Sequence, residues 1–381
     1  MSLKKKLLAT LCCILGLTTC ASCVNFATSS QSSQSEETTM EMTLSLPKED
    51  AIPYIQSAWE YLQAGAGANI RQYMVSVDNP NQAIKVKWSC EGNNVTTYKV
   101  EYATQADYSD AIVETCDGNT NFVELYNLYK ATKYYVRVTA QNEKGEALVK
   151  SEGTFTTTDI GPRVMLISDI HNVRDVGGYQ TSNGKTTKQG LIYRGGTLRP
   201  ADVYKSNLTD EGAKYMREVM GIKTEIDFRG SQEAGEITES VIPGANLTYA
   251  TLSGYADAFT GPEGYRKTFE ILADKNNYPI YYHCTGGADR TGTVTFLLNA
   301  LLGVAETELI QDYEFTTFSC YSERNSQQGV YAKYYKDFRE GLDTYAGETL
   351  QEKVESYLLS IGVTKAQLDN IKAIMYGEIA I

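Results

Sequence analysis

The hydrophobic pattern of this chain changes its period near residue 158. From Ile84 onward, apolar and polar residues alternate in "IKVKW", "TYKVEYA" and "KYYVRVTAQ", which predicts short antiparallel strands. After "DIGPR", the strand-like runs "VMLI", "KTEIDF" and "YPIYYH" alternate with helical segments such as "TGTVTFLLNALLG", which is typical of a mostly parallel sheet flanked by helices. With 381 residues, the chain is long enough to bury two hydrophobic cores. We therefore expect an all-β sandwich followed by an α/β domain.

The first residues have the features of an export signal. Lys4–Lys6 precede the apolar run "LLATLCCILGLTT", which is too short to span a bilayer and fits a secretory signal. Small residues and cysteines follow, so that residues 1–23 resemble a bacterial lipoprotein signal with Cys23 as the lipidated residue. Cys20 is the alternative, and an ordinary cleaved signal or a membrane stub is the competing interpretation. Residues 24–48, which include "ATSSQSSQSEETT", are predicted to be a flexible linker. The resemblance places the protein in the bacterial cell envelope, periplasmic or at the cell surface, on a lipid anchor.

Charge and cysteine spacing exclude several kinds of partner. The formal net charge is −12, and no lysine or arginine run follows the first six residues, which argues against nucleic acid and against docking on anionic lipid through a basic patch. The chain has eight cysteines and two histidines, in spacings that match no metal site. Outside the signal, four cysteines remain: Cys90, Cys116, Cys284 and Cys320. A disulfide between Cys90 and Cys116 and a pair of free thiols both stay open.

The segment "LYKATKYYVRVTAQN" resembles the fibronectin type III signature. Residues that carry the likeness are a leucine, a threonine, a tyrosine, two inward valines and an early-strand tryptophan: Leu128, Thr132, Tyr134, Val136, Val138 and Trp88. Lys130 replaces the usual proline. The resemblance covers residues 70–158 and implies a structural spacer or a module that contacts a partner or a glycan. Ahead of it, residues 49–69 contain "EDAIPYIQSAWEYLQ", whose spacing predicts an amphipathic helix.

The stretch "YYHCTGGADRTGTVTF", residues 281–296, predicts a strand, a glycine-containing loop and a helix. Backbone amides at such a junction, with the positive end of the helix, bind an anion. These dipoles and a nearby guanidinium lower the pKa of a cysteine, which makes Cys284 a candidate nucleophile. Arg290 has the planar fork that binds two phosphoryl oxygens, and Thr291 can donate its hydroxyl toward the sulfur. His283 is expected to order the loop by hydrogen bonding.

Together these residues resemble the protein-tyrosine-phosphatase superfamily and, within it, the atypical bacterial branch whose loop reads HCxxGKDRTG. The likeness extends to "HNVRDVGGYQTSNGKTTKQGLIYRGGTL", "GIKTEIDFRGSQE", "LLGVAETELIQDY" and "YLLSIGVTKAQLDNI", and thus covers residues 160–381. It implies that the loop binds substrate through six residues: Thr285, Gly286, Gly287, Ala288, Thr291 and Gly292. Supporting roles are implied for three residues of the other blocks: Arg174, Asp175 and Asp227. Arg194 and Arg229 are equally open between buried network and ligand contact.

Two positions qualify the resemblance. Ala288 stands where the branch carries a lysine, which removes a cation worth about 1–4 kcal/mol to a multiply charged ligand. For the general acid, the branch implies Asp289, inside the loop. The wider superfamily uses an aspartate on a separate loop, and Asp257 in "SGYADAFTG" is the alternative.

The resulting hypothesis is a cysteine-dependent phosphatase that needs no metal or other cofactor. Cys284, Arg290 and Asp289 are its expected catalytic residues, and phosphotyrosine in proteins or peptides is the expected substrate, with small phosphomonoesters also accepted. A phosphoinositide or inositol-phosphate phosphatase and a non-catalytic surface protein with a phosphatase-like pocket are the alternatives.

Overall fold

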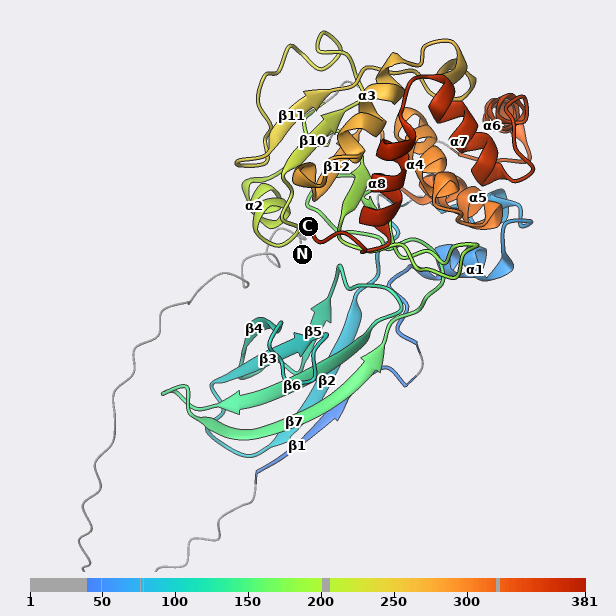
Figure 1. Cartoon of the computed structure of the whole chain (residues 1–381). Coiled ribbons are helices and arrows are strands. Elements are labelled where there is room, and N and C mark those ends of the chain that lie inside the picture. The colour runs from blue at the N-terminus through green and yellow to red at the C-terminus, as the bar shows by residue number, and fades with distance from the viewer. Residues whose placement is uncertain (1–39, 49, 76, 78, 201–205, 320–322) are drawn as a thin grey trace, which may run out of the picture. The chain divides into compact units, whose positions relative to one another are not determined.

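The computed structural model describes residues 40–48, 50–75, 77, 79–200, 206–319 and 323–381. The described part of the chain divides into two units. The first comprises its residues before 51 with 85–124 and 133–156, and the second comprises its residues within 51–84, 125–132 and 157–381 (Figure 1). The predicted signal with Cys20 and Cys23, the first part of the predicted linker, and Cys320 lie outside the described residues.

The first unit is a sandwich of two antiparallel sheets. One sheet has the order β1-β2-β5 and the other the order β4-β3-β6-β7. Their bounds are β1 Glu41–Ser45, β2 Ile84–Glu91, β3 Thr97–Ala103, β4 Ile112–Asp117, β5 Phe122–Leu125, β6 Lys133–Gln141 and β7 Ala147–Thr156. The linker predicted for residues 24–48 is therefore wrong at its end, because Glu41–Ser45 form a strand that pairs with Lys87–Glu91 of β2. The alternating side chains of "EMTLS" supply the pattern of an edge strand.

The core of this unit is formed by the inward side chains of both sheets. Val136 and Val138 are fully buried, and the Trp88 ring lies 5.1 Å from the ring of Tyr98. The period-two pattern thus correctly identified which side chains point inward. Cys90 and Cys116 are both free, half-buried thiols.

The second unit is built on a five-stranded sheet in the order β11-β10-β12-β9-β8. Its strands are β8 Arg174–Asp175, β9 Ile192–Gly195, β10 Thr224–Asp227, β11 Asn246–Tyr249 and β12 Ile280–His283. Four strands are mutually parallel and β8 is antiparallel, which confirms the mostly parallel sheet. The run "VMLI" forms no strand and makes only isolated bridges, from Val164 to Arg174 and from Ile167 to Ile170, although its apolar side chains are largely buried.

Helices cover both faces of this sheet. Their bounds are α2 Asp210–Glu218, α3 Glu263–Leu272, α4 Asp289–Leu301, α5 Glu306–Phe315, α6 Gly329–Leu342, α7 Leu350–Ser360 and α8 Lys365–Met375. Because successive strand residues point to opposite faces, Ile280 and Tyr282 of β12 join the core that contains α3 to α8. Tyr281 instead packs in a second core, with Met216 of α2. Figure 1 shows α2 set apart from the group formed by α3, α4, α7 and α8.

The amphipathic helix predicted ahead of the sandwich is α1, Gln56–Ala64, and it belongs to the second unit. Its Tyr61 and Leu62 pack in one cluster with Phe315, the last residue of α5, and with Phe318, which follows it. Among the described residues, no helix combines the length and apolar character needed to cross a membrane.

Candidate active site

The loop between β12 and α4 lies at the carboxyl end of a central parallel strand, where ligands bind in open α/β sheets. The strand ends at His283 and the helix begins at Asp289, so that five residues, 284–288, form the turn. Gly287 adopts φ +66°, and a Cβ at this position would lie 2.3 Å from the carbonyl carbon of Gly195. Only glycine allows the loop to approach β9 so closely.

The loop carbonyls are all engaged by surrounding groups. The amide of Thr197 donates to the Thr285 carbonyl (3.0 Å), and the Asn172 side chain donates to the carbonyls of Gly286 (3.2 Å) and Gly287 (2.9 Å). Arg194 also donates to the Gly287 carbonyl (2.8 Å). With the carbonyls turned outward, the loop amides face the interior of the turn, where an anion would bind. Ala288 is buried at the N-cap of α4, and Gly292 donates its amide to the Ala288 carbonyl (2.8 Å).

Cys284 is buried at the start of this loop. Burial by itself would raise the pKa of the thiol, but the Arg290 guanidinium and the hydroxyl and amide of Thr291 hold it below its ordinary value. Thr291 Oγ1 is buried and has no other partner in the part of the chain that the structure describes, so its hydroxyl can donate a hydrogen bond to the Cys284 sulfur. A thiolate in this position is a nucleophile at neutral pH.

Arg290 is paired with a residue that the sequence analysis did not single out. Its guanidinium makes two parallel bonds to the carboxylate of Glu233, each 2.8 Å long. The same carboxylate accepts from the Thr285 hydroxyl (3.3 Å), and the Arg290 guanidinium holds the pKa of Glu233 below its usual range. Glu233 thus occupies the planar fork that a phosphoryl group would use. The residue lies within the quoted block "GIKTEIDFRGSQE", but its distance from the loop in sequence gave no sign of the contact.

His283 contacts the loop and the neighbouring strand through the two nitrogens of its ring. Its Nε2 lies 3.0 Å from Glu225 Oε1, and its Nδ1 lies 3.2 Å from the Cys284 carbonyl oxygen. Both ring nitrogens therefore face acceptors. Burial by itself would lower the pKa of His283, but Asp227 and Glu225 hold it above its ordinary value, which favours the doubly protonated ring.

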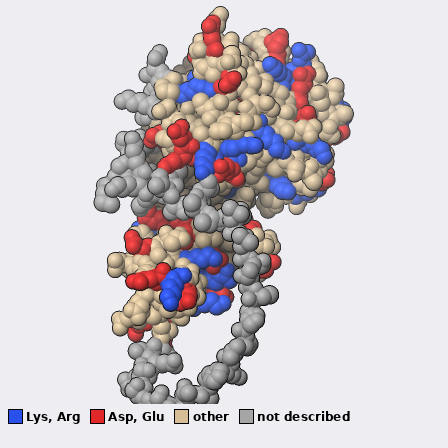
Figure 2. Space-filling view, turned by 90° about the vertical axis from the view of Figure 1, so that its left-hand side faces the viewer, with Lys and Arg blue, Asp and Glu red and all other residues tan. Residues whose placement is uncertain are grey.

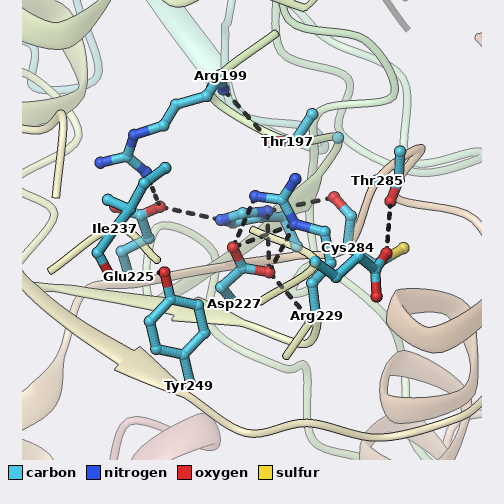
Figure 3. A network of polar contacts seen from close by, with 12 residues as sticks. Thr197, Arg199, Glu225, Asp227, Arg229, Ile237, Tyr249, Cys284 and Thr285 are labelled. Carbon is cyan, nitrogen blue, oxygen red and sulfur yellow. Dashed lines mark hydrogen bonds and ion pairs between the residues drawn. The ribbon is translucent and has the colours of Figure 1, made fainter. Parts of the chain in front are cut away.

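Asp227 also holds Arg229 by a short ion pair, in which Arg229 Nη2 lies 2.7 Å from Asp227 Oδ2 (Figure 3). Arg199 lies at the far side of the network, with Nη1 3.4 Å from Glu225 Oε1. The predicted supporting residue Asp227 is thus placed next to His283, whereas Arg229 and Arg199 are engaged by carboxylates.

The two candidate acids lie on different elements. Asp289 is the first residue of α4, and its carboxylate is 38% exposed and accepts from the Tyr255 hydroxyl (2.6 Å). Asp257 lies on the short 3-10 helix η3, Tyr255–Phe259, and is exposed. A Cβ on Gly254, just before η3, would lie 3.1 Å from the Asp289 carbonyl carbon, so η3 starts directly against the loop.

The other predicted supporting residues do not reach the loop interior. Arg174 is buried, binds Asp312 with Nε 3.0 Å from Oδ1, and is linked to the loop through Asn172, to whose Oδ1 it donates. Asp175 binds Arg163 (Nη1 to Oδ2, 2.8 Å) and accepts from the amide of Gly190, away from the loop. Within the described residues, no three histidine, cysteine or acidic side chains converge to hold a metal ion.

Comparison with known families agrees with this geometry. The model of the tyrosine phosphatase family matches residues 165–377, more than half of the chain. The chain belongs to this family. A fibronectin type III domain matches residues 69–157, which confirms the resemblance seen in "LYKATKYYVRVTAQN". Both parts of the predicted fold are thereby confirmed, a β sandwich followed by a phosphatase domain with a sheet flanked by helices.

Individual relatives within the family are distant. A Cupriavidus necator protein named "putative tyrosine-protein phosphatase" is 26% identical over 179 residues, which are 40% of this chain and 63% of that protein. The chain therefore spans less than two thirds of that relative. A Nostoc commune tyrosine-protein phosphatase is 24% identical over 216 residues, which are 46% of this chain and 72% of that protein. Among solved structures, the catalytic core of the S. cerevisiae PP-IP phosphatase SIW14 covers 45% of this chain and 88% of its own, with 18% identity and a TM-score of 0.26.

Proposed function

We propose that this protein is a cysteine-dependent phosphatase that hydrolyses phosphomonoesters, above all phosphotyrosine in proteins or peptides. The observation that carries the proposal is the setting of Cys284. The pKa of its thiol is lowered by Arg290 and Thr291, at the start of a loop whose carbonyls all face outward. A nucleophile and an anion-binding turn in one loop suit attack on a phosphoryl group.

In the proposed reaction, the Cys284 thiolate attacks phosphorus in line with the leaving oxygen. The S–P bond forms as the P–O bond breaks, and the leaving oxygen takes a proton from Asp289. Arg290 exchanges the Glu233 carboxylate for two phosphoryl oxygens and stabilises their charge. Water, deprotonated by the same aspartate, then cleaves the cysteinyl phosphate, and the thiolate departs toward Thr291.

The cations around the loop favour a substrate with one phosphate. Ala288 supplies no charge, while Arg229 and Arg199 are engaged with Asp227 and Glu225. On the face shown in Figure 2, basic and acidic side chains of the larger unit lie close to one another. A multiply phosphorylated inositol lipid or inositol phosphate would need further unengaged cations, so this alternative is the second candidate.

A substrate profile of the purified full chain tests the proposal. Phosphotyrosine peptides and aryl phosphates should be hydrolysed with higher kcat/KM than phosphoserine peptides, phosphoinositides or inositol phosphates. A higher kcat/KM for phosphoinositides would instead support the second candidate, a phosphoinositide or inositol-phosphate phosphatase. Binding of phosphate esters without turnover of any of them would favour a non-catalytic surface protein.

We further propose that the phosphatase acts in the bacterial cell envelope, attached through lipid on Cys23. The apolar run after Lys4–Lys6 and the serine-rich stretch that follows support this arrangement. The fibronectin type III domain would then serve as a spacer or contact a partner or glycan. The substrates in that compartment would be phosphorylated proteins, peptides or small molecules.

A further inference from the structure

Both carboxylate oxygens of Asp289 are held by one buried arginine. Arg324 Nε lies 2.8 Å from Oδ1 and Arg324 Nη2 lies 2.9 Å from Oδ2, the parallel arrangement that fixes a carboxylate in a plane. The Arg324 side chain is 2% exposed, whereas that of Asp289 is 38% exposed. The Tyr255 hydroxyl donates to Oδ1 from another direction. Arg324 and Tyr255 therefore fix the orientation of the carboxylate that we propose as the acid, while part of the Asp289 side chain stays exposed.

Arg324 is itself fixed by its surroundings. Its amide donates to Thr317 Oγ1 (2.9 Å), and the Thr317 hydroxyl donates back to its carbonyl (3.0 Å). Its guanidinium carbon lies 3.8 Å from the centre of the Tyr331 ring, which adds a cation–π contact. Thr317 lies on the 3-10 helix η5, Thr316–Phe318, directly after α5.

The residues on both sides of Arg324 are bound by a segment from the beginning of the chain. Arg71, on the 3-10 helix η2 (Ile70–Gln72), donates from Nε to both carboxylate oxygens of Glu323 at 2.7 and 2.9 Å. The Asn325 amide donates to Glu323 Oε1 (2.8 Å) and to Asn69 Oδ1 (3.3 Å). These contacts join residues 252 and 256 positions apart, within the second unit.

The same segment also holds the end of α5. The Tyr61 hydroxyl of α1 donates to Glu314, whose other oxygen accepts from the amide of Ser326 (2.7 Å). Gln311 donates to the Leu62 carbonyl (3.0 Å). The segment 61–71 thus contacts α5 and the Arg324 loop, residues 323–328, although strands β2 to β7 of the sandwich lie between them in the sequence.

We propose that Arg324 is the positioning residue for Asp289, and that the segment 61–71 is part of the catalytic unit because it holds the Arg324 loop. The inference rests on the proposed function, in which Asp289 protonates the leaving oxygen. The family match begins at residue 165, so this segment lies outside it.

The test compares two leaving groups in the full chain. An acid matters most when the leaving oxygen is basic, so Arg324→Gln should lower kcat for phenyl phosphate about tenfold or more while p-nitrophenyl phosphate changes less than about threefold. KM for either substrate should change little. Arg324→Lys, which keeps the charge but not the planar fork, should fall between the wild type and Arg324→Gln. If Arg324→Gln does not fold, Arg324→Lys alone still has to lower the kcat ratio, which is kcat for phenyl phosphate divided by kcat for p-nitrophenyl phosphate.

Arg71→Ala tests the second half of the proposal on a residue whose side chain is 48% exposed and whose loss should leave the fold intact. It should lower the same kcat ratio about threefold, the scale of an exposed ion pair. The matched control is Arg339→Gln, which breaks ion pairs with Glu306 and Asp343 and should leave the ratio unchanged. An unchanged ratio in Arg324→Gln or Arg71→Ala would overturn the inference while the wild type still turns over both substrates. Absence of wild-type turnover would instead overturn the proposed function.

Discussion

Ala288 stands where the loop motif that the sequence resembles has a lysine, and its replacement has a predictable result. Ala288→Lys should shift preference toward multiply phosphorylated inositol lipids, because a cation near a second phosphate is worth about 1–4 kcal/mol. The measurement is the ratio of kcat/KM for a phosphoinositide to that for a phosphotyrosine peptide, which should rise at least about tenfold. Ala288→Gln, similar in length but uncharged, is the control. A ratio that rises equally in both variants would point to side-chain size rather than charge.

Single substitutions also distinguish the two candidate general acids, Asp289 and Asp257. Asp289→Asn should reduce hydrolysis of phenyl phosphate about 10²-fold and that of p-nitrophenyl phosphate far less, because only the poorer leaving group needs the proton. Asp257→Asn should change both substrates alike or neither. If the dependence on leaving group is found at Asp257 instead, the acid comes from η3 and our assignment is wrong.

The sequence identified the residues of the loop itself but not those that reach it from elsewhere. His283, Cys284 and Arg290 lie within one strand–loop–helix unit, so local pattern was enough to bring them together. Glu233 contacts Arg290 across 57 positions and Arg324 contacts Asp289 across 35, and such pairings depend on how the sheet and helices pack. Neither residue stands in a pattern that carries chemistry by itself. The signal available for Glu233 was its place in a block shared with the family.

At the scale of elements, the pair formed by Glu225 of β10 and His283 of β12 links two central strands and makes stability depend on pH. Burial by itself would raise the pKa of Glu225, but His283 holds it below the ordinary value. The contribution of Glu225 is therefore present above about pH 4.3 and is lost as the pH falls through the lowered pKa. The pKa of His283 is raised, so its contribution is complete below about pH 6.5 and is lost as the pH rises through the raised pKa.

Glu225→Gln should consequently lower the free energy of unfolding by about 3 kcal/mol between about pH 4.3 and 6.5, and by less at higher pH. Urea unfolding at pH 5.5 and pH 9 checks this expectation. The exposed Glu270, replaced by Gln, serves as the control and should have little effect at either pH. A loss of stability at Glu225→Gln that is equal at both pH values would contradict the account of the pair.

Helices and strands were predicted best where the spacing of the apolar residues matches the period of the element that they form. The predicted strand, loop and helix around Cys284 are all present, and the helix, α4, begins at Asp289. "VMLI" is as apolar as a buried strand and is largely buried, but its backbone makes only isolated bridges, at Val164 and Ile167. Composition does not reveal that it has no neighbouring strand to pair with along its length. β1 is short and half-exposed, so its pattern differs little from that of the polar stretch before it.

At the scale of the whole molecule, the order of segments in the chain did not reveal their grouping in space. The segment 51–84 follows β1 of the sandwich and leads into β2, but it belongs to the second unit, through contacts such as that of Tyr61 with Phe318 (ring centroids 5.9 Å apart). The local pattern of an amphipathic helix does not predict which of the two cores it will cover, because each core offers an apolar surface.

Attachment to the envelope is a property of the full chain. Labelled palmitate should be incorporated into the wild type and into Cys20→Ala but not into Cys23→Ala, because lipidation is specific to the cysteine that follows the signal. Loss of label only in Cys20→Ala would move the attachment to that residue. Absence of label in the wild type would leave an exported or signal-bearing protein without the proposed anchor.

The central claim is that Cys284 carries the phosphoryl group during turnover. Rapid quenching of the wild type with a ³²P-labelled phosphotyrosine peptide should trap label on the peptide fragment that contains Cys284, and EDTA should not change the yield. Cys284→Ser should trap no label and release no phosphate, since a serine hydroxyl is far less ionised at neutral pH, yet it should still bind the peptide. Phosphate release by Cys284→Ser at a rate near that of the wild type, or label on a fragment without Cys284, would contradict the account.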